Sequence, residues 1–192
     1  MPWPPHIIKA FEIASQNGDT IEAEYYLPYN HLLMHLFPPE ENFLVHPQHP
    51  LRDEENKSSY VDLTIIFVIR HPDKPVFFLE VKPGGFIHSR SGRRGADRQM
   101  QNRFDDFIES VEIQTFYGIS AIGTSLCVYT QDRKTGYVLP ELIPSNRRNL
   151  GYSVDTAPAN RWNLDVLTPQ GEERLRNVAT HVKTMCTELQ PE

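Results

Sequence analysis

Two strongly apolar runs joined by a short polar turn constrain the fold of this chain more than any other feature. The stretch YVDLTIIFVIRHPDKPVFFLEVK covers residues 60–82, and the HPDKP in its middle has the proline and aspartate typical of a turn. Runs rich in valine, isoleucine and phenylalanine predict β-strands, and the short connection between them predicts an antiparallel hairpin. The sequence therefore predicts a hairpin of two core strands.

Charged residues stand in both runs where a buried strand should have none. Asp62 lies near the start of the first run, and Glu80 and Lys82 end the second. Because side chains alternate along a strand, Glu80 and Lys82 share one face, and antiparallel pairing brings Asp62 to the same end of the sheet. Two carboxylates and a lysine gathered there could bind a hard divalent cation and orient a water molecule. The alternative is an ordinary solvated strand end, because a Glu-x-Lys triplet is expected about once by chance in a chain of this size.

The rest of the sequence predicts one α/β domain over residues 1–192. Helices are predicted over 6–16, 19–37 and 96–111 and from 168 onward, with Pro28 kinking or splitting the second helix. Further strands are predicted in 42–47, 118–123, 125–131 and 136–142, and a Gly- and Arg-rich loop over 83–95. This order predicts a central mixed sheet flanked by helices.

Charge and cysteine content narrow the class of protein. A net charge of −6 argues against a chain that coats nucleic acid by bulk attraction, although it leaves room for a local basic groove. Cys127 and Cys186 are expected to be buried, reduced thiols, which suits an intracellular protein of the cytoplasm or nucleus. No run approaches the roughly 18 apolar residues that a membrane span needs, so no membrane partner is expected.

A basic cluster follows the second apolar run. The segment HSRSGRRGADRQMQNR, residues 88–103, has a single acid, Asp97, and five arginines: Arg90, Arg93, Arg94, Arg98 and Arg103. Guanidinium groups suit phosphate oxygens, so these arginines are candidates for binding nucleic acid, with a solvated loop as the alternative. On the predicted helix, Gln101 flanks the apolar stripe and is the candidate polar helper beside the site, whereas Gln99 is expected to point away.

Asp62, followed eighteen residues later by Glu80 in LEVK, resembles the PD-(D/E)XK nuclease superfamily, with its restriction-endonuclease-like αβββαβ core. Residues 22–38, 74–82 and 161–186 are more specifically similar to a poorly characterised group of fungal proteins with this fold. The resemblance implies phosphodiester cleavage that depends on Mg²⁺ or Mn²⁺. It implies Asp62, Glu80 and the Val81 carbonyl as metal ligands, and Lys82 as the group that holds or activates the attacking water. One departure is Val61, which stands where the name-giving motif has proline.

Members of this superfamily often add a glutamate from the first core helix, and the sequence offers Glu22 and Glu24. Helical spacing groups Glu22 with the core-facing apolar residues and Glu24 with a more polar face, so Glu22 is favoured as a further metal ligand. The alternative is an exposed glutamate that interacts with the helix dipole.

Two functions follow from these observations. The first is a metal-dependent nuclease acting on DNA or RNA, for which a homodimer is an open alternative to a monomer. The second is a catalytically inactive protein of the same fold, in which Asp62, Glu80 and Lys82 form a structural ion cluster and the surface serves as a binding or interaction module.

Overall fold

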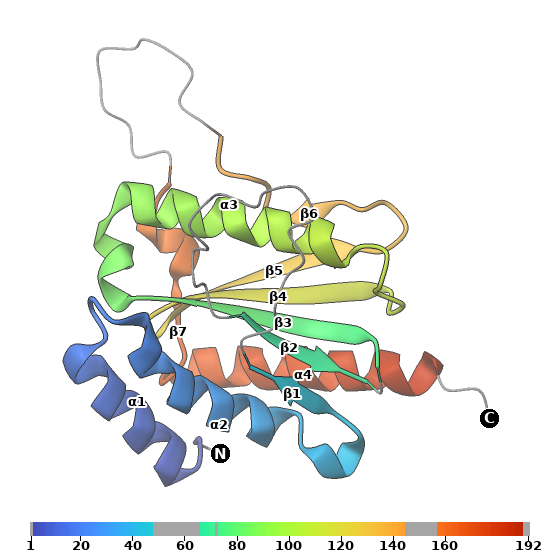
Figure 1. The fold of residues 1–192 in the computed structure, drawn as a ribbon, viewed down its shortest axis with the longest axis horizontal. Coiled ribbons are helices and arrows are strands. Elements are labelled where there is room, and N and C mark those ends of the chain that lie inside the picture. The colour runs from blue at the N-terminus through green and yellow to red at the C-terminus, as the bar shows by residue number, and fades with distance from the viewer. Residues whose placement is uncertain (1, 48–65, 72, 145–156, 190–192) are drawn as a thin grey trace, which may run out of the picture.

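A mixed β-sheet forms the middle layer of the fold (Figure 1). The structure is a computed structural model that describes residues 2–47, 66–71, 73–144 and 157–189. Within these residues the sheet has seven strands: β1 (Leu44–His46), β2 (Ile66–Arg70), β3 (Pro75–Lys82), β4 (Thr115–Ile122), β5 (Ser125–Asp132), β6 (Val138–Leu139) and β7 (Leu164–Asp165). Strands β1 to β6 lie in sequence order and β7 pairs with β5. The pair β3–β4 is parallel and the other pairs are antiparallel.

Helices cover both faces of this sheet. The α-helices of the described residues are α1 (Pro5–Asn17), α2 (Tyr26–Leu36), α3 (Arg90–Phe107) and α4 (Pro169–Leu189). Helix α3 lies on one face, whereas α1, α2 and α4 lie on the other (Figure 1). The predicted α/β class, the mixed sheet and the order of helix, three strands, helix, strands and helix are confirmed.

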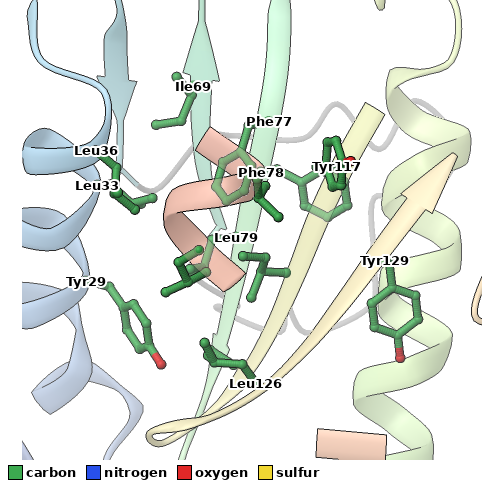
Figure 2. Packing of buried hydrophobic residues seen from close by; sticks show 14 of the residues in the cluster. Tyr29, Leu33, Leu36, Ile69, Phe77, Phe78, Leu79, Tyr117, Leu126 and Tyr129 are labelled. Carbon is green, nitrogen blue, oxygen red and sulfur yellow. The ribbon is translucent and has the colours of Figure 1, made fainter. Parts of the chain in front are cut away.

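Strand β3 is buried along its whole length because both of its faces are covered. On one face the Phe77 ring lies 5.3 Å from that of Phe37, just after α2, and on the other the Phe78 ring lies 5.0 Å from that of Phe104 in α3. Figure 2 shows Leu33 and Leu36 of α2 directed toward the sheet from one side. Glu80 shares the face of Phe78, so its charge is held inside the α3 layer.

The predicted helix over 19–37 is divided, but not at Pro28. A 3₁₀ turn, η1 (Glu22–Tyr25), precedes α2, and Pro28 is the third residue of α2. The first backbone N–H groups of a helix have no partner within the helix, so proline is tolerated there. The break therefore comes from the change between 3₁₀ and α geometry.

The predicted loop over 83–95 is wrong. A short 3₁₀ turn, η3 (Gly84–His88), is followed directly by α3. Ser89 caps the helix, since its hydroxyl accepts a hydrogen bond from the Gly92 N–H at 3.1 Å. A side chain at Gly92 would place its Cβ only 3.0 Å from the Phe86 ring, so this glycine reflects close packing and not a turn.

Three further predictions concern single residues and the membrane. Cys127 and Cys186 are buried and free, as predicted. Trp162, in the 3₁₀ turn η4 (Ala159–Trp162), anchors its segment by donating an indole hydrogen bond to Ser120 Oγ at 3.1 Å. No helix of the described residues is long and apolar enough to cross a membrane.

Candidate functional site

The chain that follows β3 is fixed to the turn after α1. The Gly84 N–H donates to the Gly18 carbonyl at 2.8 Å, and the Gly85 N–H donates to the Asp19 carbonyl at 2.9 Å. A Cβ at Gly85 would lie 2.5 Å from the Asp19 oxygen, so the backbones can approach this closely only because position 85 is glycine. This contact brings η1, which begins at Glu22, beside the end of β3.

Lys82 lies between two carboxylates at this point. Its Nζ is 3.9 Å from Glu22 Oε2 and 3.9 Å from Glu80 Oε1. The Lys82 side chain is 8% exposed and those of Glu22 and Glu80 are 17% and 2% exposed, so the group is largely shielded from water. Tyr26, one turn after Glu22, donates its hydroxyl to Glu22 Oε1 at 3.2 Å and orients that carboxylate. The structure thus brings together Glu22, Glu80 and Lys82 from distant parts of the sequence.

Glu80 is the most strained charge of this group. Arg103 of α3 donates from Nε to Glu80 Oε2 at 3.3 Å, but no described residue donates a hydrogen bond to Oε1, which is buried. Burial raises the pKa of the Glu80 carboxyl to about 6, and the positive charges of Arg103 and Lys82 only partly oppose this effect. A buried carboxylate oxygen without a donor is uncommon and marks a place where a cation, a water molecule or a proton could bind.

Two further predicted ligands complete the candidate set. Asp62 lies outside the described residues, and in the described register Ile66 of β2 is opposite Glu80. Val81 lies on β3 between Glu80 and Lys82, so its side chain points to the opposite face and only its carbonyl could serve the site. Among the residues that the structure describes, no three His, Cys, Asp or Glu side chains are placed to share a metal ion. The described part therefore supplies two carboxylates.

Gln101 is not brought to this group. Its amide donates to the Pro140 carbonyl at 3.2 Å, beyond β6. Residues two positions apart on an α-helix differ in direction by about 200°, so Gln101 points away from the side of α3 on which Arg103 meets Glu80. Gln99, one turn before Arg103, is the glutamine that helical spacing places on that side, in contrast to the prediction.

The five arginines do not form one basic surface. Arg93 is 5% exposed and donates to the carbonyls of Ala157 at 2.6 Å and Ile87 at 2.5 Å, so its predicted role in binding nucleic acid is wrong. Arg103 contacts Glu80 and also Asp106, whose Oδ2 is 3.2 Å from its Nη1. The other three, Arg90, Arg94 and Arg98, are spaced four residues apart and lie on one stripe of α3, with Arg98 exposed and the first two half-buried.

Sequence reasoning missed two contacts of this site. The Tyr26–Glu22 hydrogen bond has a signal, since residues four apart on a helical segment are neighbours. The Arg103–Glu80 contact depends on where α3 crosses β3, which no local pattern encodes. The signal that existed was weaker: Arg103 lies three residues after Met100 and borders the apolar stripe of α3.

The site combines acceptors for a cation with a donor for an anion. Glu22 and Glu80 offer the oxygen ligands that hard divalent cations prefer, and the Lys82 ammonium beside them can hold a water molecule or a phosphate oxygen. Comparison of the chain with protein-family models, with curated proteins and with solved structures finds no match.

Proposed function

We propose that the protein is a metal-dependent nuclease that hydrolyses phosphodiester bonds of DNA or RNA. The observation that carries this proposal is the convergence of Glu22, Glu80 and Lys82 at the end of a buried strand, with one Glu80 oxygen lacking a donor among the described residues. A buried carboxylate left without a partner destabilises a fold, so its presence supports a functional role. The Asp62 and LEVK pattern of the sequence supports the same interpretation.

The described residues fit a hard divalent cation such as Mg²⁺ or Mn²⁺. Glu80 and Glu22 would hold it, and Asp62 and the Val81 carbonyl are the further ligands that the sequence resemblance implies. When bound, such a cation polarises a phosphoryl oxygen and makes a coordinated water more acidic.

The chain's own residues would supply the remaining chemistry. Lys82, whose Nζ lies 3.9 Å from Glu80 Oε1, would hold the attacking water or stabilise negative charge on the phosphate in the transition state. Arg94 and Arg98 on the stripe of α3 would contact the sugar–phosphate backbone, an interaction that weakens as salt is raised.

One observation favours the second candidate, a catalytically inactive interaction module. Arg103 already gives Glu80 a positive partner at 3.3 Å, as expected of a structural ion cluster. An intracellular location and a homodimer stay predictions for either function, and the buried free thiols support a reducing compartment.

A cleavage and gel-shift series separates the two candidates. Purified protein with Mn²⁺ or Mg²⁺ is incubated with end-labelled single- and double-stranded DNA and RNA. The wild type is expected to cut at least one substrate, and Lys82→Ala to lose cleavage while binding that substrate nearly as well. Lys134→Ala, which removes an exposed lysine of the β5–β6 turn, is the matched control and should cut like the wild type. If the wild type cuts none of the four substrates, or Lys82→Ala cuts as fast as the wild type, the protein is not this nuclease.

A further inference from the structure

We infer that Arg103 occupies the place of a cation at Glu80 and sets how tightly the site binds a divalent metal. This inference rests on the proposed function, because it concerns the same carboxylate. It assigns Arg103 as a positioning residue of the metal centre and removes it from the set of arginines that bind nucleic acid in the metal-free protein.

The geometry of the Arg103–Glu80 contact supports this role. Arg103 reaches Glu80 from α3, and the side chains are 18% and 2% exposed, so the guanidinium covers the carboxylate from the solvent side. A buried negative charge requires a positive partner, which the guanidinium provides at Oε2 while Oε1 receives no hydrogen bond from a described residue. A metal at Glu80 would add two further positive charges within a few ångströms of Arg103. Because like charges repel, the metal and the guanidinium must compete for this carboxylate.

A second partner makes the displacement of Arg103 feasible. Its Nη1 lies 3.2 Å from Oδ2 of Asp106, which is 42% exposed at the surface of α3. When Arg103 leaves Glu80 it keeps this contact, so its charge remains paired and its guanidinium stays at the edge of the site. There it could meet a phosphate oxygen of the substrate, a contact for which the guanidinium fork is suited.

The test is Mn²⁺ binding without nucleic acid, measured as free Mn²⁺ by electron paramagnetic resonance at one pH and ionic strength. Arg103→Gln is expected to bind Mn²⁺ about tenfold more tightly than the wild type, since it removes a competing charge. Arg98→Gln removes the same charge from an exposed position of the same helix and should stay within about twofold of the wild type. Glu80→Gln should lose binding.

Melting curves give a second readout that does not depend on activity. In EDTA, Arg103→Gln should melt below the wild type, because it leaves Glu80 buried without its partner. Saturating Mn²⁺ should raise the melting temperature of Arg103→Gln by more than that of the wild type, since the metal replaces the missing charge.

Asp106→Asn provides a variant at an exposed position, where folding is not at stake. Removal of the alternative partner should hold Arg103 on Glu80 and weaken Mn²⁺ binding about threefold relative to Asp105→Asn, which removes the same charge from the neighbouring exposed residue. Equal binding by the two variants would count against the displacement.

The outcomes distinguish the inference from the proposed function. If Glu80→Gln loses Mn²⁺ but Arg103→Gln binds no more tightly than Arg98→Gln, the role of Arg103 is overturned while the metal centre stands. If the wild type binds no Mn²⁺, or Glu80→Gln binds it like the wild type, both the metal centre and the role of Arg103 are overturned.

Discussion

Glu80→Gln should change how the stability of the metal-free protein depends on pH. Burial raises the pKa of Glu80 from 4.5 to about 6 in the folded protein, so between these values the folded state keeps a proton that the unfolded state releases. The stability that the wild type gains from this proton is fully present below pH 4.5 and is lost as the pH rises through 6. Glutamine carries no titrating group and escapes this loss.

The magnitude follows from the size of the pKa shift. A difference of 1.5 between the two pKa values corresponds to about 2 kcal/mol, at about 1.4 kcal/mol for each unit. The free energy of unfolding of the wild type relative to Glu80→Gln should therefore fall by about 2 kcal/mol between pH 4 and pH 7.5. Constant effects of the substitution, such as the weaker contact with Arg103, cancel in this comparison.

Urea denaturation in EDTA, followed by circular dichroism at intervals of half a pH unit, measures this difference. Both proteins contain the same other titrating groups, so their shared pH dependence is removed by subtraction. A difference that stays flat, or a wild type that gains stability relative to Glu80→Gln as the pH rises, would show that the Glu80 carboxylate is not strained. The argument for a functional Glu80 from its burial would then be refuted.

Three further predictions concern the frame around the site. Gly85→Ala should destabilise the protein by about 1–3 kcal/mol in thermal or urea unfolding, because its Cβ would lie 2.5 Å from the Asp19 oxygen, whereas Gly95→Ala, with open space around its Cβ in α3, should stabilise it by about 0.5–1 kcal/mol. Arg93→Met should cost about 2–4 kcal/mol in the same assay, since it leaves two buried carbonyls without a donor, and Arg98→Gln should have little effect; equal effects would contradict the structural role of Arg93. Replacing Arg94 and Arg98 together should flatten the dependence of nucleic-acid affinity on salt by about one unit of log–log slope for each phosphate that is no longer neutralised, and an unchanged slope in filter binding would exclude the stripe from the interface.

The sequence was most informative where local and periodic signals agree. The HPDKP turn and the apolar runs predicted the hairpin of β2 and β3, and alternation along β3 correctly put Glu80 and Lys82 on one face. The Glu22 contact with Lys82 was also anticipated, although the helical phase used for it ignored the 3₁₀ turn in which Glu22 lies. These features depend on neighbours in sequence or on a single strand pairing.

The predictions failed where tertiary contacts decide. Two glycines and several arginines suggested a loop over 83–95, but Gly92 packs against Phe86 and Arg93 donates to two distant carbonyls, so the segment folds as the first turns of α3. Gln101 was preferred over Arg103 as the helper because the phase of α3 relative to β3 cannot be obtained from the helix alone. A pattern of charges predicts that a site exists more readily than it predicts which charge completes it.

The central claim is that the carboxylates beside Lys82 form a metal centre, and a crystal grown with Mn²⁺ tests it most directly. An anomalous difference map recorded near the manganese absorption edge should show a peak bound by oxygens of Glu80 and Glu22, with the Arg103 guanidinium withdrawn from Glu80 toward Asp106. A map without a peak at Glu80, with Arg103 still donating to that carboxylate at a Mn²⁺ concentration in the millimolar range, would contradict the account and leave the cluster as a structural set of ion pairs.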